Sequence, residues 1–132
     1  MAIKLNPEYA KAYNNLGSAL FAERKIEEAI SHYKMAIKLN PDFADAHNNL
    51  GNALSAEGKI EEAISHYKMA IKNKPDFADA HYNLGNTLRK EERTSEAISH
   101  YKMAIKLKPT YAKAHNNLEK AKKNIVLIEA KE

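Results

Sequence analysis

The chain has 132 residues, of which 44% are hydrophobic and 29% charged, a composition typical of a globular domain rather than of a disordered chain. No apolar run approaches the roughly 20 residues of a membrane-spanning helix, and the absence of cysteine excludes disulfides, thiolate metal sites and cysteine nucleophiles. The net charge of +4 is a mild excess that does not by itself indicate a nucleic-acid partner. Residues 1 to 9 lack the apolar stretch of a signal peptide. The expected location, cytoplasmic or otherwise intracellular, fits these features but does not follow from them.

Prolines recur every 34 residues along the chain, at Pro7, Pro41, Pro75 and Pro109. A fixed period in the range of 20 to 50 residues is typical of a repeat array. The first two repeats share 27 of 34 residues, and the second and third share 23. The expected division is a remnant of a preceding second helix and turn, three repeats and a capping helix, at residues 1–9, 10–43, 44–77, 78–111 and 112–132.

The remnant repeats a later segment, because residues 1 to 7 are identical to Met35 to Pro41. The chain therefore starts within a repeat. Together with the high identity between repeats, this indicates an array that was excised from a longer one or built by copying one repeat.

Each repeat is expected to form two helices. In repeat 10–43 the apolar residues follow helical spacing, first from Tyr13 to Leu20 and then from Ile26 to Ile37. In repeat 44–77 the first helix starts after Pro41, with Asp42 as its expected cap and Asp45 in its first turn.

The turn between the two helices is expected at Gly58, which suits a left-handed backbone at a helix end. Arg24 and Glu92 occupy the same place in the other repeats. A left-handed conformation there costs each of them about 1 kcal/mol relative to glycine.

One glycine lies inside the first helix of each repeat, where it costs roughly 1 kcal/mol relative to alanine. We expect close helix contact to compensate, with these glycines facing alanines of the second helix. The expected pairs are Gly17 with Ala29, Gly51 with Ala63, and Gly85 with Ala97. In the capping helix Glu119 replaces the glycine and Lys122 replaces a leucine, which predicts a solvated end of the array.

The repeated pattern resembles the tetratricopeptide repeat over nearly the whole chain. The matching residues in the first repeat are Leu16, Gly17, Leu20, Ala29, Tyr33, Ala36 and Pro41. Histidine departs from the family pattern at His47, His81 and His115, where the family has tryptophan. The resemblance implies an all-α αα-hairpin solenoid, a right-handed superhelix with a C-terminal capping helix, whose concave face binds peptides or protein segments.

Asparagines form a column along the first helices, although asparagine is a poor interior helix residue. One hypothesis is a peptide-binding groove in which the amides bond an extended peptide backbone. The alternative is that the amides bond neighbouring helices. The candidate groove residues are Asn14, Asn15, Asn48, Asn49, Asn52, Tyr82, Asn83, Asn86, Asn116 and Asn117, with Tyr82 as an expected side-chain anchor.

The family's carboxylate clamp, which grips a peptide's C-terminal carboxylate, matches this chain poorly. Asn14, Ser18, Asp79 and Asn83 stand where its other members are expected, and only Asn49 agrees. The C-terminal part is nevertheless basic, which predicts either solvated helix ends or a preference for acidic ligands. The residues at this basic end of the groove are Arg89, Lys90, Lys113 and Lys120.

All six histidines belong to two repeat columns and lack the spacing of a zinc site, so we expect no metal and no cofactor. No phosphate loop or nucleotide fingerprint is present, and aromatic residues do not interleave with basic ones. We therefore expect no catalysis, no nucleic acid and no membrane partner.

The predicted function is a non-catalytic scaffold that binds a peptide or protein segment. The alternatives are a structural repeat module without a ligand and the substrate-docking part of a larger enzyme. Apolar residues near both ends, among them Tyr13, Leu16, Val126 and Leu127, also predict a weak homodimer through the chain ends.

Overall fold

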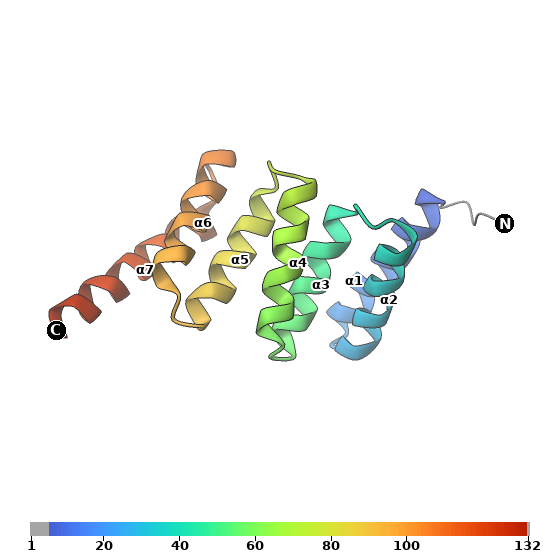
Figure 1. Cartoon of the computed structure of the whole chain (residues 1–132), viewed down its shortest axis with the longest axis horizontal. Helices are drawn as coiled ribbons and strands as arrows, with labels where there is room; N and C mark the ends of the chain where they lie inside the picture. Colours follow the sequence, from blue (N-terminus) through green and yellow to red (C-terminus); the bar gives the residue numbers. More distant parts are fainter. Residues whose placement is uncertain (1–5, 132) are drawn as a thin grey trace. The chain divides into compact units, whose positions relative to one another are not determined.

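A computed structural model describes residues 6–131, so residues 1 to 5 of the expected remnant lie outside the described residues. The described part of the chain forms seven α-helices and no strand (Figure 1), which confirms the all-α class and the αα-hairpin architecture. The chain divides into two compact units, one ending at Lys74 and one beginning at Pro75.

The N-terminal unit consists of two helical hairpins, whose helices are α1 (Pro7–Ala22), α2 (Ile26–Leu39), α3 (Ala44–Ala56) and α4 (Ile60–Asn73). Helix α1 packs on α2, α3 packs on α4, and α2 also packs on α3. The first helices α1 and α3 lie beside each other. Leu50, Leu54, Tyr33 and Tyr67 are the large buried side chains of this unit.

The C-terminal unit consists of a hairpin and a long final helix, with α5 (Ala78–Lys90), α6 (Thr94–Leu107) and α7 (Ala112–Lys131). Helix α7 packs on α6 and lies beside α5. Leu118 and Ala121 of α7 are buried against the unit, whereas Glu119 and Lys122 are exposed. The exposed charges agree with the expected solvation of this last helix.

The left-handed turns between the hairpin helices are confirmed. Gly58 has φ of 80°, Arg24 has φ of 64° and Glu92 has φ of 60°. In each turn the residue that follows donates its backbone N–H to a carbonyl of the preceding helix, as Lys59 does to Leu54. Arg24 and Glu92 therefore occupy a backbone conformation that glycine adopts without steric cost.

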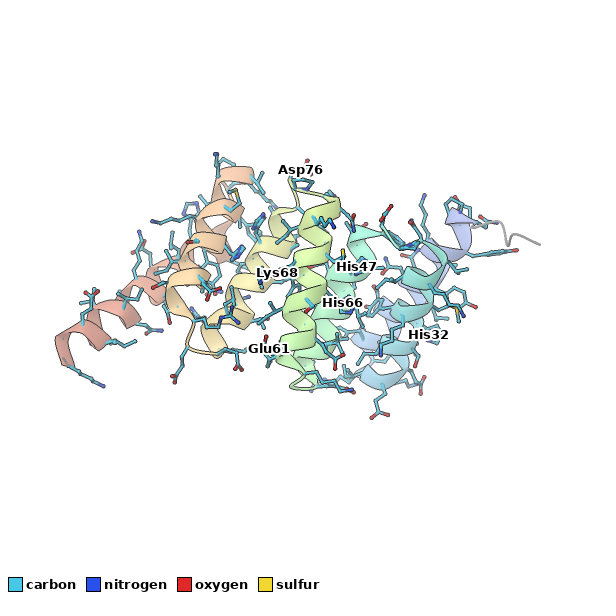
Figure 2. The ribbon with its side chains drawn as sticks, viewed as in Figure 1. His32, His47, Glu61, His66, Lys68 and Asp76 are labelled. Carbon is cyan, nitrogen blue, oxygen red and sulfur yellow. The ribbon has the colours of Figure 1, made fainter. Side chains whose placement is uncertain are left out.

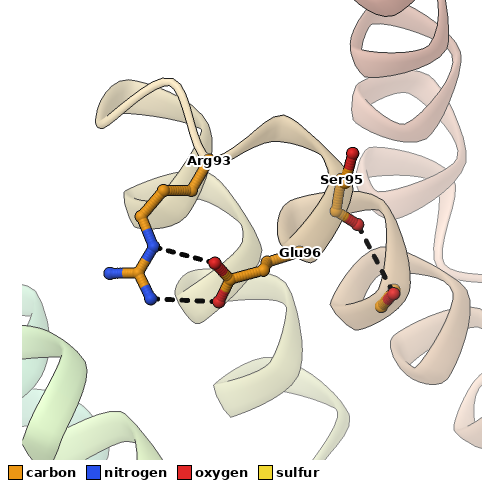
Figure 3. Close-up of polar contacts among 4 residues, drawn as sticks. Arg93, Ser95 and Glu96 are labelled. Carbon is orange, nitrogen blue, oxygen red and sulfur yellow. Dashed lines mark hydrogen bonds and ion pairs between the residues drawn. The ribbon is translucent and has the colours of Figure 1, made fainter.

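Helix α6 starts with an ion pair. Both nitrogens Nε and Nη2 of Arg93 lie 3.0 Å from the carboxylate oxygens of Glu96 (Figure 3). The pair is partly exposed, so it stabilises the helix start by no more than about 1 kcal/mol. Figure 3 also shows Ser95, whose carbonyl accepts a bond from Ser99 within the same helix.

The glycine of each first helix does allow close helix contact, but the expected partner was wrong. A Cβ atom added at Gly17, Gly51 or Gly85 would lie 2.6–2.7 Å from the nearest ring atom of a buried tyrosine, and its nearest neighbours are tyrosine atoms rather than the expected alanine. These tyrosines are Tyr33, Tyr67 and Tyr101. Each glycine therefore forms a notch that accommodates the tyrosine ring of the second helix.

The expected cap at Asp42 is also wrong. Pro41 and Asp42 form a turn, and α3 starts only at Ala44, so Phe43 is the N-cap and no side chain bonds the helix end. Asp45 does lie in the first turn, as expected. A true side-chain cap occurs at the start of α1, where Asn6 Oδ1 accepts the N–H of Glu8 at 2.9 Å.

Candidate functional site

The first helices of the N-terminal unit are joined by an amide pair. Nδ2 of Asn49 on α3 donates to Oδ1 of Asn14 on α1 at 3.0 Å. Asn14 is only 7% exposed, whereas Asn49 is half-buried. The bond is the helix-to-helix contact that the alternative interpretation of the asparagines predicts. Asn49 still has a second N–H and its own oxygen, because an amide offers two donors and two lone pairs.

An equivalent contact joins α5 and α7 in the C-terminal unit. Nδ2 of Asn117 donates to Tyr82 Oη at 3.0 Å and to Asn86 Oδ1 at 2.9 Å. Asn117 occupies the repeat place of Asn49, and Tyr82 occupies that of Asn14. The same two places therefore connect first helices in both units, although one partner has changed from an amide to a phenol.

Tyrosines of the second helices orient Asn52 and Asn86, a further polar position on the first helices. Tyr67 donates its hydroxyl to Asn52 Oδ1 and Tyr101 donates to Asn86 Oδ1, each at 2.6 Å. Burial raises the pKa of Tyr101 to about 12, so its hydroxyl keeps its proton at neutral pH. Because each amide oxygen already accepts a bond from a tyrosine, the side chain is oriented, and the Nδ2 hydrogens of Asn52 and Asn86 are the donors that a ligand can use.

The first repeat has serine at this polar position. Tyr33 donates to Ser18 Oγ at 3.2 Å, and burial raises the pKa of Tyr33 while the serine bond lowers it. The buried tyrosine hydroxyl therefore donates to a serine in the first repeat and to an asparagine in the other two. Only the asparagine also provides amide N–H donors.

The remaining candidate residues differ in exposure. Asn48 is buried, Asn83 is half-buried, and both Asn15 and Asn116 are exposed. The ten candidates thus do not form one uniform surface, because Asn14 and Asn48 are buried. The half-buried amides of Asn49, Asn52, Asn86 and Asn117 are held by defined contacts and reach the surface.

An aromatic cluster surrounds Tyr82 in the C-terminal unit. Its ring centroid lies 5.0 Å from that of Tyr111 and 6.0 Å from that of Tyr101. Burial, and then the neighbouring Asp79, raise the pKa of Tyr111 well above its ordinary value. Sequence reasoning missed Tyr111, although its place matches Phe43 and Phe77, the residues just before two first helices.

The predicted basic residues all belong to α5 and α7. Arg89 is half-buried, and its Nη1 lies 3.4 Å from the backbone oxygen of Asn117. Lys90, Lys113 and Lys120 are exposed. Lys113 and Lys120 lie four residues before and three after Asn117, so the three share one side of α7.

The histidine columns form pairs that sequence reasoning missed. His47 and His66 approach with their Nδ1 atoms 3.0 Å apart (Figure 2), and His81 and His100 repeat this at 3.1 Å. His47 Nε2 donates to the Pro41 carbonyl at 2.8 Å, so its Nδ1 must accept the proton of His66. The available signal was the recurrence of histidines 19 residues apart in two repeats.

Burial is the main cause that lowers the pKa of His66, and the nearby His47 and Lys34 lower it further while Glu62 raises it. Burial also lowers the pKa of His81. Within residues 6–131 no group of three or more histidines and carboxylates is arranged to hold a metal ion. None of the described helices has the length and apolar character to cross a membrane.

Comparisons with known proteins match most of the chain. A family model described as TPR repeat matches residues 17–58 and 51–91, and one described as tetratricopeptide repeat matches residues 78–111. A search of curated proteins found no match.

Several solved structures share the fold. The first TPR domain of Spaghetti (RPAP3) bound to the HSP90 peptide SRMEEVD has a TM-score of 0.90 and 22% identity, covering 95% of this chain and 99% of that chain. The first TPR domain of human RPAP3 gives the same score and identity over 95% and 98%. The Arabidopsis OM64 TPR domain has a TM-score of 0.87 and 21% identity over 89% and 98%. At these identities the likeness concerns the fold alone.

Proposed function

Because the chain belongs to the tetratricopeptide repeat family, we propose that it is a non-catalytic scaffold that binds extended peptide segments along its first helices. The observation that carries this proposal is the set of oriented amides at Asn52 and Asn86. A buried tyrosine occupies each amide oxygen and leaves the N–H donors for a ligand. A backbone carbonyl of a peptide is the acceptor that such a donor fits.

Within each unit, the spacing of neighbouring first helices suits an extended ligand. Neighbouring helices pack about 8 to 10 Å apart, and an extended chain advances about 3.3 Å per residue. Each first helix therefore meets roughly every third residue of a peptide that crosses it. Bonds to the peptide backbone make the binding tolerant of ligand sequence.

An acidic ligand is favoured in the C-terminal unit. Lys113 and Lys120 flank Asn117 on the exposed side of α7, and Arg89 lies beside the backbone of that residue. The peptide bound by the similar RPAP3 domain ends in Glu-Glu-Val-Asp, which is acidic. At 22% identity the likeness concerns the fold, so the acidic ligand is proposed from the charges on α5 and α7.

A peptide array with acidic and neutral seven-residue peptides, followed by calorimetry on the best binder, tests the proposal. Asn52→Ser and Asn86→Ser should each weaken binding about fivefold to tenfold, the loss of roughly one hydrogen bond. The fold should tolerate serine, because Ser18 already accepts from Tyr33 at this place. The reverse change, Ser18→Asn, should strengthen binding.

Absence of peptide binding at millimolar peptide concentration would contradict the proposed function. Binding that is equal in all three variants would show that the ligand contacts another surface. A second candidate function, a structural module that associates with itself, is favoured by exposed apolar residues on α7.

A further inference from the structure

Two histidine pairs take no part in the peptide site proposed above. In each pair the first and second helices of one hairpin contribute one ring each, which gives His47 with His66 and His81 with His100. The Nδ1 atoms lie 3.0 Å apart in the first pair (Figure 2) and 3.1 Å apart in the second, and the ring centroids are 5.3 Å apart in both. Since the centroids are farther apart than the nitrogens by about two ring radii, the rings meet through nitrogen atoms and not through their faces.

A backbone carbonyl orients the buried ring of each pair. His47 donates its Nε2 proton to the Pro41 carbonyl at 2.8 Å, so its Nδ1 carries a lone pair that points at His66. His81 likewise bonds the backbone of Pro75. Histidines that bind metal ions are oriented by such bonds, in which the nitrogen that does not bind the ion donates to a carbonyl.

The two nitrogens of a pair are as close as neighbouring ligands of one metal ion. Two imidazole nitrogens at the usual Zn–N distance of about 2.0–2.1 Å lie about 2.9 Å apart at a right angle and about 3.3 Å apart at the tetrahedral angle. The observed 3.0 Å and 3.1 Å fall between these values. An ion beside the line that joins the nitrogens needs only a turn of the half-buried ring, His66 or His100. The Nδ1 proton of that ring then moves to its Nε2, so the ring stays neutral.

The surroundings keep the rings in the form that binds metals. Burial is the main cause that lowers the pKa of both His66 and His81, and neutral imidazole is the ligand for a metal ion. Two charged groups also act on His66, and they have opposite signs. Lys34 on α2 disfavours a bound cation, whereas Glu62 on α4 favours it. The charges near this pair therefore largely compensate each other.

The same chain contains two single histidines at equivalent repeat places. His32 on α2 faces Tyr13, with 6.0 Å between the ring centroids. His115 on α7 bonds the Pro109 carbonyl at 2.8 Å, but within the described residues no helix follows α7 to supply a second ring. These two histidines provide internal controls for the two pairs.

We propose that each histidine pair binds one divalent transition-metal ion of the kind that imidazole prefers, Zn²⁺, Ni²⁺ or Cu²⁺, with water in the remaining coordination positions. The ion joins the first and second helices of one hairpin and so stabilises it. With two protein ligands the site is weaker than a structural zinc site with four. Mg²⁺ is excluded by chemistry, because it requires oxygen ligands. The sequence concealed both sites, because the paired histidines are 19 residues apart and meet only when the hairpin forms.

Calorimetric titration of the intact chain at pH 7.5 with ZnCl₂ up to about 0.5 mM measures the number of bound ions. We expect two Zn²⁺ per chain, tighter binding of Cu²⁺ and no binding of Mg²⁺. His66→Gln should leave one ion, and His66→Gln with His100→Gln should leave none. Both changes are at half-buried positions, and thermal melts without metal establish that each variant is folded.

His32→Gln and His115→Gln are the matched controls, and each should keep both ions. Zn²⁺ should also raise the melting temperature of the wild type and of these controls, but not that of the double variant. A wild type that binds no Zn²⁺, or a folded double variant that still binds two ions, would overturn the proposal. Loss of an ion in either control would assign the binding to single histidines and would overturn it as well. None of these outcomes bears on peptide binding.

Discussion

Helices α1 and α3 have nearly the same sequence but different surroundings. Leu16 on α1 is 49% exposed, whereas Leu50 at the same repeat place on α3 is completely buried. Tyr13 is 37% exposed and His47 only 5%. Helix α3 packs on α2 as well as on its own partner α4, whereas α1 packs closely only on α2 among the described helices. Identical positions in a repeat therefore make different contributions to stability, and the neighbouring helix decides which.

The largest expected effect comes from truncating the two leucines. Leu50→Ala should lower the free energy of unfolding by about 3 kcal/mol, because it leaves a cavity in a packed core. Leu16→Ala should lower it by less than about 1 kcal/mol, because water already contacts that side chain. Urea denaturation of both variants measures the difference. Equal losses would mean that α1 is covered by a partner in solution.

A smaller effect is expected on the pH dependence of stability. The second repeat has the His47 and His66 pair, whereas the first has Tyr13 beside His32. The pKa of His66 is lowered below its ordinary 6.5 in the folded chain. The unfolded chain then binds more protons in this range, so stability present above pH 6.5 is lost as the pH falls below it. The groups around His66 are His47 on α3, Lys34 on α2 and Glu62 on its own helix.

His66→Gln should reduce this acid loss by no more than about 1 kcal/mol, because glutamine keeps a donor for His47 but does not titrate. His32→Gln is the matched control in the first repeat, where the ring lies 6.0 Å from Tyr13 and has no histidine beside it. Denaturation midpoints at pH 7.5 and 5 give the comparison. The same change in both variants would exclude the pair as the source.

The smallest effect is expected at the turns. Arg24→Gly gives the first repeat the turn residue of the second and should stabilise the fold by a few tenths to about 1 kcal/mol, since φ is 64° there. Gly58→Arg is the reverse exchange and should destabilise by a similar amount. A midpoint that falls for Arg24→Gly would show that the arginine side chain contributes more than the backbone strain costs.

The sequence predicted the helices and the turns because these depend on local chemistry. Proline spacing set the repeat, and a glycine at position 58 indicated left-handed backbone for Arg24 and Glu92 as well. The cap at Asp42 failed because two turn residues separate Pro41 from the helix start. The periodic pattern of the sequence does not reveal an offset of two residues at the start of a helix.

Contacts across helices were harder to predict. Gly51 was paired with Ala63, but the ring of Tyr67 occupies the space, because the rotation of each helix decides which side chain meets the glycine. The bond from Asn49 to Asn14 and the histidine pairs depend on the same rotations. The sequence identified the polar positions of the candidate site, and only the structure shows which amide atoms remain for a ligand.

The glycine notches also fix the register of each hairpin. A slip of one helical turn, about 5.4 Å, would move the ring of Tyr33 from Gly17 to Tyr13 or Phe21, where a large side chain replaces the glycine. All three repeats have the same glycine and tyrosine pair, so this contact alone does not determine which tyrosine packs against which glycine. The short connections through Arg24, Gly58 and Glu92 make that choice, since they join each tyrosine helix to the notch nearest in the chain. Lengthening one of these connections would therefore permit exchange of second helices between neighbouring repeats while every hairpin stayed in register.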